Sequence, residues 1–453
     1  MDLVNTYDVA VIGGGVSGCA VMLALAQRVG PSYRAVLFDP AEPGRGIAYG
    51  DQSEILLMNG PARAMSVVPG DEEHLVRSLH NTAPDTMISR KRYGQYVSAT
   101  LHEAIAGRRH FKTERTTIVD IEVREDTYLL HDANGSRCRA RNVVLALGNA
   151  APGDAFLPQA IRSHARYVGN PWKFDLDAIG GNVAIVGSRL TAFDVIALLD
   201  ERGFAGRIHM ISRHGAVPAL EDPRISGTDP ATFGFKTHSA QALLRSVRAA
   251  VAQQAASDDW RTIIESLRAV IPSIWARWDT RERRRFLRHV QSFWAMHRYR
   301  VPLETYAAYE RLRERGAIDI VRGRITSAKP LAGSSLRITV ARGSVEMDVE
   351  ATTIINATGP NGDYATIDQP LVRNGLRRGV IRADRLSMGL DAGADLRLIG
   401  SGGAAQRGLF TLGPPLRGLL YESTAVPEIL RQAVQIGDTL ASMEARVELG
   451  AVS

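Results

Sequence analysis

The sequence predicts an α/β fold made of two βαβ units, each with a parallel sheet. The apolar residues 9–12 lead directly into the glycine turn 13–18, and the apolar residues 183–186 lead into a second turn that begins at Gly187. A short buried strand, a glycine turn and a helix are the expected start of such a unit. The two turns are separated by about one domain length, so we expect two domains of this type.

The composition is that of a globular protein with room for two or three domains. The chain has 453 residues, of which 45% are hydrophobic and 23% charged. Its two cysteines, Cys19 and Cys138, form no Cys-x-x-Cys pair, so we expect no disulfide framework, dithiol relay or metal site. The first strand begins by residue 7, and no apolar run approaches the roughly 20 residues that cross a bilayer. We therefore expect a cytoplasmic protein that does not contact membranes.

The basic character of the chain comes largely from one segment. The net charge is +7 and the isoelectric point is near 9.5, with many of the cations between Arg277 and Arg300. No zinc-finger spacing or RNP-like aromatic motif accompanies them, so we expect no nucleic-acid partner. The segment is either a solvated helical face or a site for phosphates and acidic ligands, and both interpretations stay open.

The first unit is expected to form around a strand, helix and strand at its start. Apolar periodicity and turn residues separate its elements. In chain order we expect a strand at 7–12, a helix at 16–29, a strand at 34–38 ending on Asp39, a Gly- and Arg-rich loop at 43–50, helices at 71–80 and 91–106, a strand pair within 117–132, and a buried strand over 142–148 that ends on Gly148.

The second unit follows a connector that contains Pro and Gly, and it is interrupted by helices. Ile263, Ile264, Leu267, Val270, Ile271 and Ile274 trace one helix face. In chain order we expect a connector at 150–172, a βαβ unit at 182–212, a long loop at 218–240, a helical insertion at 240–316, strands at 318–326, 336–341 and 345–357 before Gly359, a strand at 395–400, and a helix at 424–433.

These elements predict two domains, one of them discontinuous. We expect residues 1–172 with 356–453 to form one domain, and residues 173–355 to form the other, with a helical insertion at about 218–316. The fold class is then two Rossmann-like dinucleotide-binding domains, the arrangement of flavoproteins that bind two dinucleotides, with the insertion in the second domain.

The first glycine turn has the complete context of a dinucleotide fingerprint. Gly13 and Gly15 permit a tight turn and a close approach to a pyrophosphate, and Gly18 permits close packing of the helix on the strand. Ser17 lies in the first turn of that helix, whose N-terminus favours phosphates. Asp39, at the end of the second strand, can accept hydrogen bonds from a ribose diol. Because this unit opens the chain, we expect it to bind FAD.

The second turn departs from the fingerprint at its middle position. It consists of Gly187, Ser188, Arg189, Leu190, Thr191 and Ala192. Arg189 replaces a glycine, which adds bulk but also a cation. The following strand ends on Ser212 and Arg213, where an NAD-specific site would carry an acid, and a hydroxyl with a guanidinium suits the 2′-phosphate of NADPH. A unit that keeps the fold without binding a nucleotide is the alternative.

Three longer blocks resemble the bacterial FAD/NAD(P)-binding family. They are 44–50 (GRGIAYG), 57–66 (LMNGPARAMS) and 421–429 (YESTAVPEI), and the stretch 297–300 (HRYR) also fits a family pattern. This resemblance implies FAD and a nicotinamide cofactor more firmly than it implies a reaction. In such proteins the strand-ending glycines Gly148 and Gly359 lie where the chain passes between domains.

A more distant resemblance is to class B flavin monooxygenases, including the N-hydroxylating ones. Asn59, followed by Met65, is similar to their asparagine segment beside the flavin, and the linker around His164 and Tyr167 is similar to theirs. The C-terminal flavin-binding segment corresponds to Leu412-Gly413, here followed by proline without the usual carboxylate. The linker is one residue short and lacks the preceding Phe-x-Gly.

The resemblance implies an FAD-dependent monooxygenase reduced by NADPH. It would act through a flavin C4a-hydroperoxide and dioxygen on a small polar metabolite, with Asn59, Arg45 and Arg63 as candidate catalytic residues. A flavin dehydrogenase or oxidase and a non-catalytic flavin sensor are the alternatives. Each candidate also has a structural interpretation: Asn59 as a turn residue, both arginines as surface cations, and Trp275, Trp278, Phe293 and Trp294 as core rather than a substrate cage. A homo-oligomer stays open.

Overall fold

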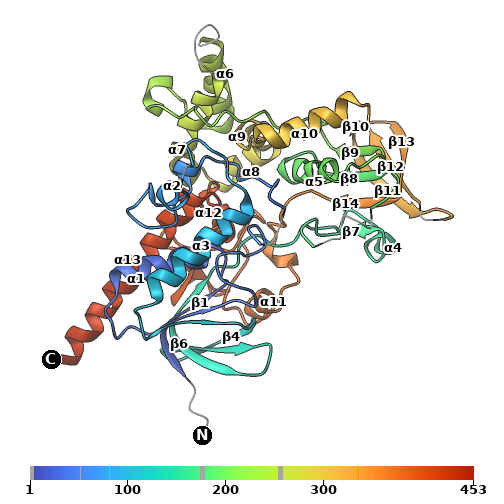
Figure 1. Cartoon of the computed structure of the whole chain (residues 1–453). Helices are drawn as coiled ribbons and strands as arrows, with labels where there is room; N and C mark the ends of the chain where they lie inside the picture. Colours follow the sequence, from blue (N-terminus) through green and yellow to red (C-terminus); the bar gives the residue numbers. More distant parts are fainter. Residues whose placement is uncertain are drawn as a thin grey trace.

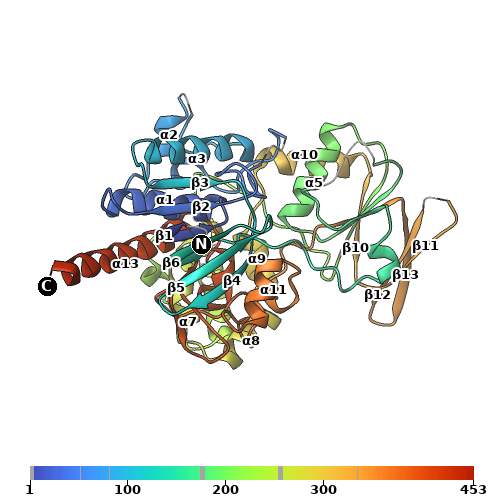
Figure 2. The ribbon, with the colours of Figure 1, turned by 90° about the horizontal axis from the view of Figure 1, so that it is seen from below.

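The computed structural model describes residues 5–50, 53–80, 82–173, 179–253, 259–333 and 335–452 (Figure 1). Part of the predicted insertion, 254–258, therefore lies outside the described residues. The first unit contains the N-terminal strand and the long C-terminal helix. The second unit extends to the opposite side, where Figure 2 shows a small sheet far from the C-terminus.

An eight-stranded sheet organises the first unit. Its main path runs β15-β16-β6-β1-β2-β3, while β5 pairs with both β4 and β6. Strand β1 pairs in parallel with β2 and with β6, which buries the apolar residues 9–12 at the centre. Its strands are β1 (Thr6–Ile12), β2 (Ala35–Phe38), β3 (Phe111–Glu114), β4 (Ile118–Arg124), β5 (Thr127–Asp132), β6 (Arg137–Leu145), β15 (Arg397–Ile399) and β16 (Ala405–Thr411).

Helices cover both faces of this sheet. On one face α13 packs along α1, and Gly437 permits the approach because a Cβ there would lie 3.1 Å from the Cβ of Ala24. On the other face Asn374 of α11 donates to the carbonyl of Val119 in β4. The helices are α1 (Val16–Arg28), α2 (His74–Ser78), α3 (Arg90–Ile105), α11 (Pro370–Arg377), α12 (Arg417–Leu420) and α13 (Val426–Val452).

The second unit contains a parallel sheet and a smaller antiparallel one. The parallel sheet has the order β10-β9-β8-β14-β7, and the antiparallel sheet has the order β11-β12-β13. Helix α5 (Leu190–Glu201) follows β8, as a βαβ unit requires. The strands are β7 (Tyr167–Val168), β8 (Val183–Val186), β9 (Ile208–Ser212), β10 (Ile318–Arg322), β11 (Arg324–Pro330), β12 (Leu336–Arg342), β13 (Val345–Ala351) and β14 (Thr353–Asn356), and the short helix α4 (Gln159–Arg162) precedes them.

Most of the helical insertion does not pack on the second unit, where it was expected. Its helices are α6 (Ala240–Gln253), α7 (Trp260–Arg277), α8 (Thr280–His289), α9 (Gln291–Arg298) and α10 (Leu303–Glu314). Only α10 packs on α5 of the second unit. Helices α6–α9 instead share a core with Met388 and Tyr421 of the C-terminal segment. The insertion thus joins the two units, because its apolar face is buried against the first one.

The large aromatic side chains of the insertion are mostly core, as the structural interpretation predicts. Trp275, Trp278 and Trp294 are buried, and the indole N–H of Trp275 donates to the carbonyl of Gly418 at 2.9 Å. Phe293 is the exception, because half of its surface is exposed.

The predicted α/β fold with two parallel-sheet units is confirmed, with local corrections. The helix expected at 71–80 is confined to His74–Ser78, the strand expected at 142–148 is β6 at Arg137–Leu145, and the final helix continues far beyond residue 433. Strand β7 lies before residue 172 but pairs with β14 of the second sheet. Strands β3 and β16 were not predicted.

Candidate functional site

The first glycine turn forms a tight cradle at the carboxyl end of β1. Gly13 has φ +106°, and a Cβ there would lie 2.2 Å from the carbonyl oxygen of Ala146. A Cβ on Gly18 would lie 1.9 Å from the oxygen of Gly13. Gly15 differs, since the nearest atom to its Cβ position is the Cα of Gly46 at 3.9 Å. The turn is therefore closed on the protein side and open beside Gly15, at the N-terminus of α1.

The carboxylate of Asp39 holds this turn in place. One oxygen accepts from the backbone N–H of Gly14 at 2.6 Å, and the other accepts from that of Ala41 at 2.8 Å. A carboxylate has about four acceptor sites, so both oxygens can accept further hydrogen bonds. The half-buried Arg45 follows in the next loop, where its Nε lies 3.0 Å from Glu42.

The C-terminal segment returns to the same turn. Leu412 is fully buried, and a Cβ on Gly413 would lie 3.0 Å from the hydroxyl of Ser17. The N–H of Gly413 donates to the side chain of Gln432 in α13 at 2.6 Å. Residues separated by almost 400 positions therefore meet at the first fingerprint.

The asparagine segment has one exposed and one buried candidate. The side chain of Asn59 is exposed and forms no hydrogen bond within the described ranges. Met65 is buried, and its methyl group packs over Gly60. Arg63 is ion-paired with Asp85 and donates to the carbonyl of Pro223 at 2.7 Å. Arg63 thus links the two units through the loop that precedes the insertion.

The second glycine turn is equally tight at its start. Gly187 has φ +121°, and a Cβ there would lie 2.3 Å from the carbonyl oxygen of Ala357. The hydroxyl of Ser188 donates to the carbonyl of Ala216 at 2.7 Å. Arg189 is the N-cap residue of α5, and Thr191 lies half-buried in the first turn of that helix.

The strand ends around the second turn are accessible. The hydroxyl of Ser212 accepts from the N–H of Gly215 at 3.1 Å, and Arg213 is exposed beside it. Gly148 and Gly359, which follow β6 and β14, have φ +62° and +89°. A Cβ at either glycine would meet no heavy atom within 4 Å. Open space therefore adjoins the carboxyl ends of both parallel sheets, where such folds bind ligands.

A buried ion pair fixes the two units against each other. Arg90, at the start of α3, contacts Asp194 of α5 at 2.8 Å, and both side chains are largely buried. Burial raises the pKa of Asp194, while Arg90 lowers it. The guanidinium of Arg90 also lies over the ring of Trp172 at 5.3 Å.

Sequence reasoning missed a buried network of charges that joins two of the resembling blocks. Glu422 accepts from the indole of Trp294 at 2.9 Å and lies 3.6 Å from Arg298. Arg300 contacts Glu221 at 2.9 Å and Glu265 at 2.6 Å. Part of the basic segment 277–300 is therefore neither a solvated face nor a free anion site.

The network continues into the first turn of α13. There Arg268 of α7 contacts Glu428 at 2.8 Å. The side chain of His297 lies outside the network: it is exposed, and its ring packs edge-on against Trp260, while its carbonyl accepts from Arg300 at 3.1 Å. The bases of the block 297–300 and the acids of the block 421–429 were the available signal for this pairing, but their spacing does not reveal the partners.

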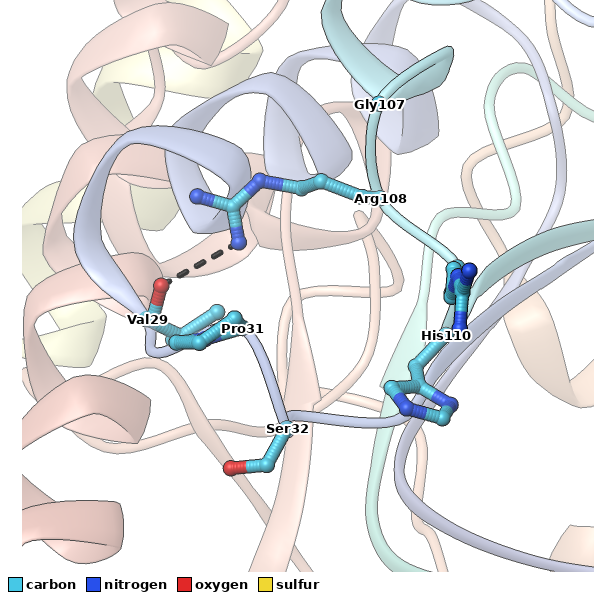
Figure 3. A pocket seen from close by; sticks show the side chains of 7 residues that line it. Val29, Pro31, Ser32, Gly107, Arg108 and His110 are labelled. Carbon is cyan, nitrogen blue, oxygen red and sulfur yellow. Dashed lines mark hydrogen bonds between the residues drawn. The ribbon is translucent and has the colours of Figure 1, made fainter.

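A surface pocket of about 630 Å³ lies at the other end of the first sheet (Figure 3). Its lining residues immediately precede β2 and β3, at the amino ends of these strands. Arg108 does not offer its charge there, because it donates to the carbonyl of Val29 at 3.1 Å and to that of Ala26. These carbonyls end α1, where a cation is favourable. The pocket is separate from both fingerprints.

Two kinds of site are absent from the described ranges. No group of three His, Cys, Asp or Glu side chains could hold a metal ion there. No described helix combines the length and apolar character that a bilayer crossing requires.

Comparison with known families supports the first fingerprint. Residues 10–150 match the family model described as FAD-NAD(P)-binding. The predicted resemblance to this family is therefore confirmed over the first fingerprint, the Asp39 strand and the asparagine segment. No curated protein matches the sequence.

Solved structures match nearly the whole chain. An ornithine N-hydroxylase from Kutzneria sp. 744, described with reduced FAD, NADP+ and L-ornithine, matches with a TM-score of 0.64 and 14% identity over 97% of this chain and 100% of its own. An FAD-bound cadaverine monooxygenase from Erwinia amylovora matches at 0.66 and 12%, over 97% and 95%. A bacillithiol disulfide reductase from Staphylococcus aureus matches at 0.60 and 8%, over 97% and 99%. The chain thus has the two-dinucleotide-binding flavoprotein fold.

Proposed function

We propose that this protein is an FAD-dependent monooxygenase that takes electrons from NADPH and oxygenates a small polar metabolite. The observation that supports it most is the pair of tight glycine turns, at β1 and β8, within one fold that N-hydroxylating monooxygenases share. Bound FAD would supply electron transfer and oxygen activation, and NADPH the reducing equivalents. The residues of the chain bind, orient and shield these groups.

The first turn fits the diphosphate of FAD. Gly15 leaves its outer side open, and the backbone N–H groups at the start of α1 point to that space, where the helix N-terminus favours negative charge. Asp39 can accept from a ribose hydroxyl while it holds Gly14. Gly413 and Leu412 would close the site from the C-terminal segment, since Gly413 touches Ser17. Gly148 follows β6 at the adjoining strand end, and Met65 packs over Gly60 in the asparagine segment.

The second turn fits a nicotinamide dinucleotide with a 2′-phosphate. Gly187 provides the tight start, and Ser212 ends β9 with Arg213 directly after it, at the position that contacts the adenine ribose. Arg213 is exposed and forms no ion pair in the described ranges, so its guanidinium is available to a phosphate. Ser188, Arg189 and Thr191 surround the N-terminus of α5, and Gly359 leaves space beside them.

The reaction with dioxygen and substrate is assigned to the loops of the first unit. Asn59 is available to donate a hydrogen bond because its amide is exposed and unpaired in the described ranges. Arg45 lies in the loop that touches Gly15 through Gly46, so its cation can stabilise negative charge near the flavin site. Arg63 would act in the same way only after releasing Asp85.

The match to a bacillithiol disulfide reductase suggests disulfide reduction as another function. This chain, however, contains no dithiol that could carry out that reaction. Cys19 is buried and Cys138 lies in β6, far apart in sequence. Burial raises the pKa of each thiol to about 12, which disfavours the reactive thiolate.

Flavin binding is tested first, by two glycine substitutions. Gly15→Ala places a methyl group in the open side of the cradle without a clash in the protein, so we expect a folded protein that has lost its FAD. Gly107→Ala is the matched control, because a methyl group there meets no atom within 4 Å and lies away from the fingerprint. Flavin extracted from the purified proteins is measured by absorbance. Full FAD retention in Gly15→Ala would contradict the proposed site.

Oxygen transfer is tested by a metabolite screen that follows NADPH consumption and product mass. A monooxygenase gives a product heavier by one oxygen atom, with little peroxide. Stoichiometric peroxide with every metabolite indicates an NADPH oxidase. A flavin that NADPH does not reduce indicates a flavin-binding sensor.

A further inference from the structure

The side chain of Arg90 contacts three segments that come from different parts of the fold. Its Nε donates to the carbonyl of Leu57 at 3.1 Å, and one of its terminal nitrogens donates to the carboxylate of Asp194 at 2.8 Å. Its guanidinium lies 5.3 Å from the centre of the Trp172 ring. The three segments are the asparagine segment, helix α5 and the connector between the units. One planar group therefore joins the loops of the first unit to the nucleotide helix of the second.

On the first side, backbone hydrogen bonds fix the asparagine segment to the start of α3. The N–H of Arg90 donates to the carbonyl of Leu56 at 2.7 Å, and the N–H of Met58 donates to that of Ile88 at 2.9 Å. Asn59 follows this ladder directly. The position of Arg90 is therefore coupled to the position of Asn59 through the main chain.

On the second side, Asp194 belongs to the helix that begins at the second glycine turn. It lies five positions after the N-cap residue Arg189, which is about 7.5 Å along the helix axis. The far end of α5 also contacts the first unit, since the hydroxyl of Ser53 donates to the carboxylate of Glu201 at 2.9 Å. That contact is exposed, whereas the contact of Arg90 with Asp194 is largely buried. The buried contact is the stronger constraint on where α5 lies.

The relative position of the units matters because each glycine turn belongs to a different unit. Two reacting groups must approach to about 3–3.5 Å, and a displacement of about 1 Å can slow a reaction about a hundredfold. If FAD is held at β1 and NADPH at β8, the spacing of their rings depends on the contacts between the units. Arg90 provides the most direct of the contacts described above, because it reaches both sides with one side chain.

We propose that Arg90 is a positioning residue that sets the separation of the two cofactor sites, with Leu57 and Asp194 as its anchors. This inference rests on the proposed function. The step concerned is the transfer of a hydride, with both of its electrons, from NADPH to FAD, which leaves NADP+. Neither anchor belongs to the glycine turns 13–18 and 187–192. Loss of Arg90 therefore slows this step and leaves both cofactors bound.

The test compares three measurements on the FAD-loaded protein: flavin reduction at saturating NADPH by stopped flow, FAD content by absorbance, and NADP+ affinity by calorimetry. The main variant combines Arg90→Met with Asp194→Leu. It leaves no charge buried without a partner, and such replacements are often neutral for stability. Apolar contacts are not directional, so they do not fix the position of α5. We expect the reduction rate to fall about tenfold to a hundredfold, with FAD content and NADP+ affinity unchanged.

Two single variants sharpen the comparison. Arg90→Lys keeps the charge opposite Asp194 but has one nitrogen in place of the planar fork, so it should show a smaller loss of rate. Arg311→Ala is the matched control. It removes an exposed ion pair of 2.7 Å to Asp200 on the same helix, but from α10 within the second unit. Its reduction rate should equal that of the wild-type protein.

Other outcomes overturn the inference in distinguishable ways. An unchanged rate in the main variant, with wild-type flavin reduced by NADPH, overturns it alone and leaves the ion pair as a stabilising contact. Loss of FAD, or weaker NADP+ binding with an unchanged saturated rate, assigns Arg90 to binding and also overturns it. If the main variant does not fold, a wild-type rate in Arg90→Lys overturns it. Wild-type protein that binds both cofactors but is not reduced by NADPH overturns the proposed function, and this inference with it.

Discussion

Six arginines form two groups with opposite surroundings. Arg268, Arg298 and Arg300 each face a glutamate within 4 Å, and Arg268 and Arg300 face two each. Arg189, Arg213 and Arg417 have no acidic partner in the described ranges. The first group is neutralised by the protein, so its contribution is to the fold. The second group keeps its charge available for a ligand.

The difference shows why the number of cations in a sequence does not identify a binding site. Both groups belong to one basic chain, and the buried group includes two members of the basic segment 277–300. Burial without a counter-charge is unfavourable, so a buried cation is normally paired. A cation that remains half-buried and unpaired is therefore the more informative observation.

The largest expected effect is a loss of folding stability when an arginine of the paired group is replaced. Arg300→Ala leaves Glu221 buried without its cation and removes one of the cations that face Glu265, so we expect a loss of about 3–5 kcal/mol in the free energy of unfolding. Arg407→Ala, in an exposed pair, should change it little. Urea unfolding measures both. Equal stabilities would show that the buried pairs of Arg300 contribute no more to stability than an exposed pair.

The next effect is on cofactor preference, from the unpaired group. Arg213→Ala should weaken the binding of NADPH by about 1.5–3 kcal/mol, the range for a charge-assisted hydrogen bond. The binding of NADH should be almost unaffected. The ratio of the two dissociation constants measures it. Equal losses for both cofactors would contradict recognition of the 2′-phosphate.

A smaller effect concerns pH. Burial alone would raise the pKa of Glu265, but Arg298, Arg300 and Arg268 outweigh it, so the folded pKa lies below the ordinary value of 4.5. This contribution to stability is therefore complete above pH 4.5 and is lost as the pH falls through the lower folded value. Glu265→Gln should unfold with a shallower dependence on pH in that acid range, by about 1.4 kcal/mol per unit of pKa depression. An unchanged slope would show that the three arginines do not stabilise the charged form of Glu265.

The smallest effect is on the stability of the unpaired group. Arg189→Ala removes a half-buried cation that two others repel, so we expect unchanged or slightly higher stability without ligand. The difference should appear only with NADP+, which at a hundred times its dissociation constant stabilises wild-type protein by about 2.7 kcal/mol. Thermal unfolding with and without NADP+ measures this. A large loss of stability without ligand would show that Arg189 stabilises the fold, as the paired arginines do.

The two fingerprints were predictable because their determinants are local. An apolar run of four residues followed by a glycine turn specifies strand, turn and helix within about twenty positions, and the structure places β1–α1 and β8–α5 there. Strand β16 was missed because its burial depends on parallel pairing with β6, which is more than 250 residues away. The partners Arg268 and Glu428 are separated by 160 positions, and no spacing rule relates them.

The sequence by itself therefore determined two dinucleotide units, their order and the glycines of each cradle, because short-range sterics and hydrophobic periodicity dictate these features. Only the tertiary structure decided which arginines are neutralised and which remain free, and that the insertion packs on the C-terminal segment. Electrostatic pairing depends on distances between side chains in space, and these are set by the packing of helices that lie far apart along the chain.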